Sequence, residues 1–579
     1  RDDVESRGLG DVYKRQQWEI IPDLRLKVSL GTDIMYHKTN RYTPSTIYQA
    51  NGTATAQIGI NKSINWLNEN TLTWNKTFAE DHDLNLLGGF TMQKNNTEYV
   101  MASSSNFVND VMEYNNLGAG SVYNKPESNA MQWSLMSYLA RVNYTLKHKY
   151  LFSVNARVDG SSRFGANNKY GFFPSASAGW RISEEAFMEP VKETISNLKL
   201  RASYGFTGNT EIGVYESLAT LGTSNWILGN QLVSGFFPNK IPNPDLKWER
   251  TGQFDIGLDL GLFNNRVRIT TDYYKKKTTD LLYSVAVPAT SGYQTMLKNI
   301  GSIENQGYEL SIESDNLTGP FSWTTAFNIS FNRNKVLELG GEDYKEMAEG
   351  DGHIKTGSVR RLIAGEPIGV FYGYRFDGIF QNEEECKQQT SSASPIGVGL
   401  RRYKDLNGDG KVDAANDREI LGDANPKFFG GLTNTFAYKG FELNVFLQYS
   451  YGNKILNYNA MELENPTGGQ NAYADMVNRW TPENPSNIYP KATTNRAILA
   501  SDRFIEDGSY LKLKTLSLSY SFPKINMKHI QGLRLYVTGQ NLLTWTKYRG
   551  YDPEVSYRGA STLELSLIHI SEPTRLDVI

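Results

Sequence analysis

The sequence predicts an all-β protein, a large antiparallel transmembrane β-barrel. Hydrophobic residues recur with a period of two instead of 3.6, and the strand-like segments number roughly 17. Many segments are around ten residues long, the length a tilted strand needs to cross a bilayer, whereas strands of soluble sheets usually have about five or six. Minimal turns also alternate with long polar loops, as in outer-membrane barrels.

The composition excludes several other classes. The chain has 579 residues, 39% hydrophobic and 12% aromatic, with 60 Lys and Arg against 62 Asp and Glu. No apolar run reaches the roughly 18 residues of a transmembrane helix, and the many aromatic residues argue against a disordered chain. A net charge of −2 gives no electrostatic reason to bind nucleic acid. The single cysteine, Cys386, excludes an internal disulfide.

The clearest strand pattern is the segment 254–262, where apolar residues fill every even position and Asp or Gly fills every odd one. The turn Phe263-Asn264-Asn265 follows, and alternation resumes over 267–274, which predicts a hairpin with one apolar face and one polar face. The same alternation recurs in the segments 150–158, 441–449, 516–522 and 533–537.

The connections fall into two length classes. Short turns are expected at 147–149, 263–265 and 439–440. Long polar loops are expected at about 97–130, 207–250, 335–367, 376–428 and 452–508. Tyr, Trp and Phe flank the apolar stretches, as in the aromatic girdles of membrane barrels. A polar inner face for each strand explains the low mean hydropathy of −0.48.

A large soluble all-β protein, such as a propeller or several sandwiches, is the structural alternative. A propeller should show a repeat of about 40–50 residues with fixed motifs, and the sequence has none. Strand length and the asymmetry of the turns favour the barrel.

The two ends are predicted to be non-native. Residues 8–16 and 565–575 resemble translated sequencing-library adapters, so 1–16 and 565–579 are excluded from fold prediction. The expected domain is therefore a β-barrel over 17–564, incomplete at both ends.

Across nearly all of 17–564 the chain resembles the barrel of the SusC/RagA family, the TonB-linked outer-membrane importers of glycans and peptides. No single motif carries the resemblance, but the motifs occur in the order that the family has. They are Arg157–Gly165, Phe173–Ser175, Gly179–Arg181, Arg201–Asn209, Asn243–Glu249, Asp272–Tyr274, Asn299–Gly301, Gly539–Trp545 and Tyr551–Glu554.

The resemblance implies a multi-pass barrel of 22 strands in the outer membrane of a Gram-negative cell, with a plug domain in its lumen. By the same resemblance, this sequence is expected to lack the plug, some strands and the TonB-contacting segment. The implied partners are a SusD-like surface lipoprotein, the TonB-ExbB-ExbD complex, outer-membrane lipid and an oligosaccharide or peptide substrate. The implied function is active import, not enzymatic catalysis. The alternatives are a passive porin and a soluble β-rich protein that binds or hydrolyses glycans.

One segment matches a metal-binding motif. The segment 405–413 fits the start of a D-x-[DN]-x-[DN]-G calcium loop, in which hard oxygens alternate along the chain and a glycine permits the sharp turn. No cofactor is required by the sequence, but a structural Ca²⁺ or Mg²⁺ is predicted here, with a metal-free turn as the alternative. The predicted ligands are Asp405, Asn407, Asp409, Lys411 through its carbonyl, Asp413 and Asp417.

Aromatic residues in the long loops, such as Trp226, Phe236 and Tyr372, have the chemistry to stack on sugar rings. A role in the aromatic girdle or in loop cores is the favoured interpretation for them. Substrate-binding residues are therefore not assigned from the sequence.

Overall fold

The computed structural model describes residues 2–8, 12–47, 50–347, 358–464, 471–493, 498–522 and 532–554. The chain forms two compact units. Unit 1 consists of 1–179, 203–251 and 280–299, and unit 2 of 180–202, 252–279 and 300–579. Eighteen strands of the described residues belong to large antiparallel sheet structure, and the others form small sheets of two to four strands. The predicted all-β class is confirmed.

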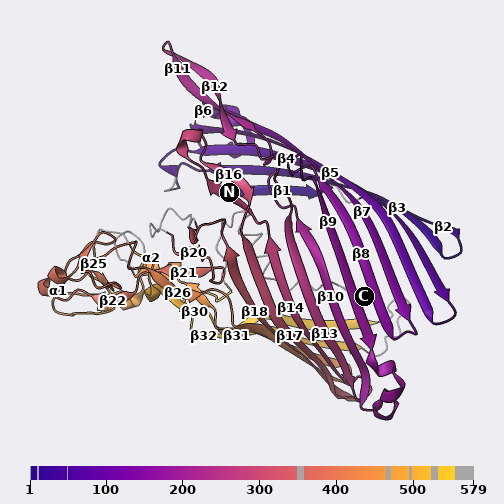
Figure 1. The fold of residues 1–579 in the computed structure, drawn as a ribbon. Helices are drawn as coiled ribbons and strands as arrows, with labels where there is room; N and C mark the ends of the chain where they lie inside the picture. Colours follow the sequence, from indigo (N-terminus) through magenta and orange to yellow (C-terminus); the bar gives the residue numbers. More distant parts are fainter. Residues whose placement is uncertain are drawn as a thin grey trace. The chain divides into compact units, whose positions relative to one another are not determined.

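Unit 1 is built on long antiparallel strands that pair in chain order (Figure 1). These are β3 (Leu24–Thr43), β4 (Thr55–Phe78), β5 (His82–Phe107), β7 (Glu127–Leu146) and β8 (Tyr150–Ser161). Two strands at the start of the chain, β1 (Asp2–Gly8) and β2 (Val12–Ile21), both pair with β3. Backbone pairing accepts almost any residue, so the non-native origin of 1–16 stays a prediction. The predicted adapter segment 565–579 lies outside the described residues.

Shorter elements complete unit 1. The hairpin β11–β12 projects from the long strands at the top of Figure 1. The further elements are η2 (Glu113–Asn115), η3 (Leu117–Ala119), β6 (Gly120–Tyr123), β11 (Thr220–Leu228), β12 (Gln231–Lys240), β15 (Leu282–Ala286), η6 (Ala289–Ser291) and β16 (Thr295–Asn299). Three strands have residues in both units: β9 (Tyr170–Arg181), β10 (Ile195–Asn209) and β13 (Glu249–Leu262).

Unit 2 contains a second ladder, in which β14, β17, β18, β27, β28, β31 and β32 pair in that order. Their bounds are Val267–Thr279, Ser302–Leu317, Phe321–Glu338, Phe428–Tyr438, Phe441–Tyr451, Tyr510–Phe522 and Leu533–Thr546. Two 3₁₀ turns, η4 (Ile182–Glu184) and η5 (Ala186–Val191), lie between β9 and β10.

The long loops of unit 2 fold into small elements of their own, drawn in orange in Figure 1. Short strands and single helical turns pack there around buried residues such as Phe380 and Phe504. The strands are β19 (Tyr344–Glu346), β20 (Arg360–Ile363), β21 (Val370–Gly373), β22 (Phe376–Ile379), β23 (Thr390–Ser391), β24 (Arg401–Tyr403), β25 (Lys411–Val412), β26 (Glu419–Asp423), β29 (Lys454–Leu456) and β30 (Ile505–Asp507). The helices are α1 (Glu383–Gln388), α2 (Tyr458–Leu463), η7 (Ala474–Asn478) and η8 (Asp502–Phe504).

The predicted short turns are present at the predicted places. In the turns 147–149 and 263–265 consecutive residues have positive φ, for example Lys147 at 51° and Asn264 at 57°. Lys439 and Gly440 likewise have φ values of 46° and 88°. This geometry matches the right-handed twist of the flanking strands, and so it allows the chain to reverse within a few residues.

The strand lengths differ from prediction. Segments of around ten residues were expected, but β5 has 26 residues and β4 has 24. The predicted loop 97–130 is accordingly shorter, since β5 continues to Phe107 and β7 begins at Glu127. Beyond the apolar stretch both faces carry polar residues, so the hydrophobic period disappears while the backbone ladder continues.

Large apolar side chains lie uncovered on one face of the long strands. On β8, for example, Phe152 is 47% exposed and Val154 is 55% exposed, although both belong to the strongest apolar alternation of the strand. A soluble sheet would cover such a face, whereas a barrel presents it to lipid. No helix of the described ranges is long and apolar enough to cross a membrane.

Candidate functional site

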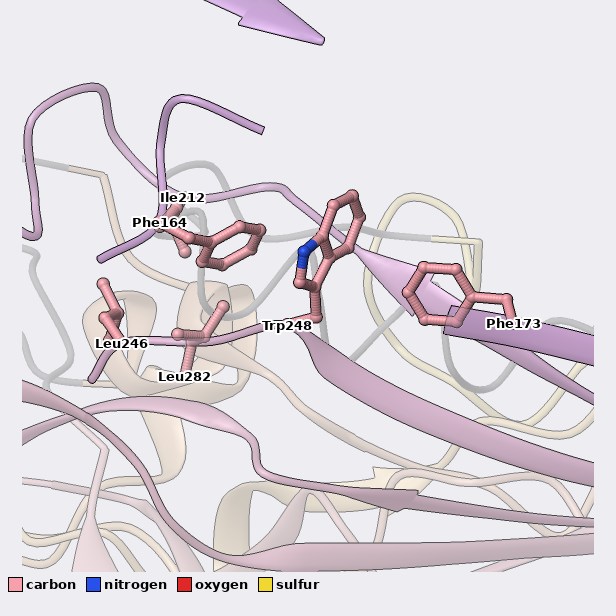
Figure 2. Packing of buried hydrophobic residues seen from close by; sticks show 6 residues of the cluster. All are labelled: Phe164, Phe173, Ile212, Leu246, Trp248 and Leu282. Atoms are coloured by element: carbon pink, nitrogen blue, oxygen red, sulfur yellow. The ribbon is translucent and has the colours of Figure 1, made fainter. Parts of the chain in front are cut away.

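Motifs that lie far apart in the sequence meet in one buried cluster of unit 1, the motif cluster. Figure 2 shows Trp248 between Phe164 and Phe173, with ring centroids 4.9 Å and 5.3 Å away. Phe164 and Leu246 are only 1% and 0% exposed. The motif cluster consists of Phe164, Phe173, Ile212, Leu246, Trp248 and Leu282.

Gly165 brings two of these motifs into backbone contact. Its amide donates to the carbonyl of Leu246 at 3.0 Å, and the amide of Asn167 donates to the carbonyl of Pro244 at 3.1 Å. A Cβ at position 165 would lie 2.1 Å from the oxygen of Pro244, so only glycine permits this approach. The close contact between the motifs Arg157–Gly165 and Asn243–Glu249 therefore requires a glycine at position 165.

Polar motif residues tie the same region together. Glu249 is 5% exposed and accepts hydrogen bonds from the Asn209 side chain and the Leu282 amide, both at 2.8 Å. The side-chain amide of Asn299 donates to the carbonyls of Lys247 and Asp280 at 2.7 and 2.9 Å. These groups satisfy loop backbone that would otherwise be buried without partners. The arrangement holds loops in place.

Arg201 and Asp272, from two further motifs, form an ion network with Asp259 on the polar face in unit 2. The guanidinium of Arg201 binds both oxygens of Asp259, at 3.0 and 3.2 Å, and an oxygen of Asp272 at 2.7 Å. Gly257 lies directly beneath, because a Cβ there would be 2.3 Å from the Asp272 carboxylate. Charged groups thus lie on the face opposite to the apolar one, as expected for strands with one face on lipid and one on the lumen.

The predicted calcium loop is an acidic turn in unit 2 whose carboxylates are held by backbone amides. Asp405 accepts from the amides of Gly408 and Gly410, both at 2.7 Å. Asp417, which is fully buried, accepts from the amides of Leu406 and Asp413, again at 2.7 Å, and so closes the loop.

The other predicted ligands lie in the same turn. The amide nitrogen of Asn407 donates to Asp409 at 3.0 Å, and the ammonium of Lys411 contacts Asp413 at 3.1 Å. Hydrogen bonds from the Asn416 backbone and from Lys411 lower the pKa of Asp413. Among the described residues no three His, Cys, Asp or Glu side chains are grouped to hold a metal ion. The predicted ligand set also includes an amide oxygen and a backbone carbonyl, so metal binding stays a prediction.

The last motif, Tyr551–Glu554, is fixed by a buried lysine. The side chain of Lys512 on β31 is 0% exposed; its ammonium lies 3.0 Å from Asp552 and also contacts Glu554, which in turn receives Lys514 at 2.7 Å. Burial alone would raise the pKa of Glu554, but the hydrogen bonds from Lys512 and Lys514 outweigh it and lower the pKa below its usual value. This ion cluster was not predicted, because Lys512 belongs to none of the sequence motifs.

The loop aromatic residues fall into two groups. Tyr372 stacks on the guanidinium of Arg361, whose carbon lies 3.7 Å from the ring centroid, so it belongs to a loop core as the favoured interpretation expected. Trp226 and Phe236 lie on the β11–β12 hairpin, 55% and 74% exposed. Trp226 covers Gly235, where a Cβ would lie 2.6 Å from the indole.

Comparisons with known proteins agree with this architecture. The family model of the TonB dependent receptor-like β-barrel matches residues 5–542. TonB-dependent receptor P3 of Formosa agariphila is 40% identical over 545 residues, covering 93% of this chain and 54% of its own length. TonB-dependent receptor SusC of Bacteroides thetaiotaomicron is 33% identical over 441 residues, covering 73% of this chain and 41% of its own length. The chain thus spans about half the length of the curated relatives that it matches.

A solved structure extends the likeness to three dimensions. The structure of the RagAB peptide transporter superposes with a TM-score of 0.82 at 27% identity, covering 96% of this chain and 60% of that chain. The matched proteins are transporters and receptors, not enzymes. With a family model matched over most of its length and long strands that carry one apolar and one polar face, the chain belongs to the β-barrel family of TonB-dependent receptors, outer-membrane proteins of the SusC and RagA kind.

Proposed function

We propose that this chain is the barrel of an active outer-membrane importer of oligopeptides or oligosaccharides. The observation that carries the proposal is the likeness to the RagAB peptide transporter over 96% of the chain. The identity to SusC, although it covers less of the chain, supports the same class of transporter. The polar face of the strands, with its ion pairs, is suited to line a hydrated path through the barrel.

Energy for import comes, in this proposal, from the TonB-ExbB-ExbD complex acting on a plug domain. A SusD-like surface lipoprotein captures the substrate and covers the loops. Both partners follow from the kind of protein this chain is similar to, and neither is part of the structure. A SusD-like gene beside the intact gene would be the first support for the partnership.

The test uses the intact gene in a Gram-negative host with and without a functional TonB. Labelled oligopeptides and oligosaccharides are supplied separately, and accumulation inside the cell is measured. We expect accumulation of one class, lost when TonB is absent. Uptake that is independent of TonB and of the proton gradient would instead identify a passive porin.

Membrane location is tested independently of transport. The chain should be found in the outer-membrane fraction and should need detergent for extraction, because its long strands expose apolar side chains such as Phe152 and Val154. Extraction into plain buffer would favour the soluble β-rich alternative.

We also propose that the turn 405–417 binds Ca²⁺ as a structural ion. The alternating oxygens of Asp405, Asn407 and Asp409 support this, together with Gly410, whose φ of 78° permits the sharp turn. Calorimetry with CaCl₂ on the refolded chain should give one binding event that Asp405→Ala with Asp409→Ala removes. Unchanged calcium affinity in that variant would eliminate the proposal.

A further inference from the structure

The apolar face of unit 1 changes to a basic one at a definite level. In antiparallel strands, residues directly opposite each other point to the same side. On this face Trp66 of β4 is opposite Lys94 of β5, which is opposite Ser134 of β7. One step towards the short-turn end, Met92 is opposite Met136. Apolar and charged side chains therefore meet between positions 92 and 94 of β5.

The apolar stretch below Lys94 has the length of a strand that crosses a membrane. On the same face β5 carries Leu84, Leu86, Gly88, Phe90 and Met92. The nine residues from Leu84 to Met92 fall within the roughly 9–11 residues that a tilted strand needs to cross a bilayer. Lys94 is consequently the first charge that β5 presents above the hydrocarbon region.

A cavity of about 310 Å³ lies at this level. Apolar side chains, polar residues and two lysines line it. Tyr170 covers Gly160, where a Cβ would lie 2.4 Å from the phenol ring. The residues that matter for its chemistry are Trp66, Met92, Lys94, Met136, Lys169 and Tyr170.

Neither lysine is neutralised within the part of the chain that the structure describes. Lys94 and Lys169 form no ion pair there, whereas the loop lysines Lys247 and Lys240 do. The acid on the same strand and face, Glu98, is four residues away, roughly 13 Å along the strand. The cavity therefore keeps two positive charges above an apolar floor.

We propose that this cavity binds one anionic membrane lipid, with its phosphate between Lys94 and Lys169 and its acyl chain over Met92 and Met136. Trp66 and Tyr170 have the amphipathic rings that favour the level of lipid headgroups. The alternative is that both lysines only extend their ammonium groups into water and hold no phosphate. The inference depends on the membrane location and is independent of import.

The test is lipid binding by native mass spectrometry of the full chain in a mild detergent. Phosphatidylglycerol is added as the anionic lipid and phosphatidylcholine as the zwitterionic one. We expect one phosphatidylglycerol to bind in preference to phosphatidylcholine. Replacing both lysines, Lys94→Gln with Lys169→Gln, should weaken phosphatidylglycerol binding about 25-fold, or about fivefold for each lysine, the usual effect of a basic residue beside an anionic lipid surface.

The matched control is Lys27→Gln, which removes the same charge from the opposite, polar face of β3 and should leave phosphatidylglycerol binding unchanged. Equal binding of the two lipids, or an unchanged affinity in the double variant, would overturn the proposal. Displacement of phosphatidylglycerol by excess inorganic phosphate would also overturn it, since the site would then recognise a soluble anion. Circular dichroism is used to check that the variants keep their β structure, so that a loss of binding can be attributed to the site.

Discussion

Replacing Phe164 by alanine should open the motif cluster without dissolving the strands around it. Phe164 is 1% exposed and its ring lies 4.9 Å from that of Trp248. Truncating a buried Phe to Ala costs about 3–5 kcal/mol, because transfer energy is lost and a cavity remains. The cost falls on the contact between the segments 160–170 and 243–249, which Gly165 and Leu246 join through their backbone.

The assay is hydrogen exchange of the backbone amides in detergent. If the destabilisation of about 3–5 kcal/mol lowers the free energy of local opening by the same amount, exchange accelerates roughly 150- to 5,000-fold. The acceleration should appear in peptides that contain Gly165 and Leu246, whose amides donate to the carbonyls of Leu246 and Asn243. Peptides from the ladder β4–β5 should exchange as before.

The matched control is Phe236→Ala. Phe236 is 74% exposed on the β11–β12 hairpin, so the same change of side chain should alter exchange in 160–170 and 243–249 by less than about threefold. An equal effect of both variants, or an exchange rate in Phe164→Ala within fivefold of the parent, would refute the idea that the ring holds the two motifs together.

Two further predictions concern the same loops and the last motif. Gly165→Ala should lower the free energy of unfolding by about 1–3 kcal/mol and accelerate exchange at the contact with Pro244, because the new Cβ would lie 2.1 Å from a backbone oxygen. The control is Gly88→Ala, where no atom lies within 4 Å of the new Cβ, so the same measurement should show no change. The lowered pKa of Glu554 means that its ion pair with Lys512 contributes stability above the unfolded pKa near 4.3 and loses it as the pH falls through the lower folded pKa. Exchange of the segment 549–554, corrected for intrinsic rates, should therefore rise only below about pH 4; a rise already at neutral pH, or none at pH 2, would contradict this assignment.

The sequence alone identified strands by their alternating faces, and the short turns between them, but not where the long strands end. Side chains alternate across a strand, so the apolar positions from 150 to 158 identified one face of β8 without any knowledge of its neighbours. Asn264 and Asn265 tolerate positive φ, so they identified a tight turn locally. The acidic turn 405–417 was also found from sequence, because most of its hydrogen bonds join residues within a few positions.

Only the tertiary structure determined what the motifs do. Phe164 and Trp248 are 84 positions apart, and nothing local in either motif specifies the partner of its aromatic ring. The ion pair of Lys512 also depends on the fold, which places Glu554 beside it. The ends of β5 were likewise invisible to the hydrophobic period, because backbone pairing extends the ladder past the apolar band. Turns and strand faces depend on residues that are close in the sequence, so they can be predicted from it. Contacts across the sheet depend on strand register and loop closure, which only the complete fold determines.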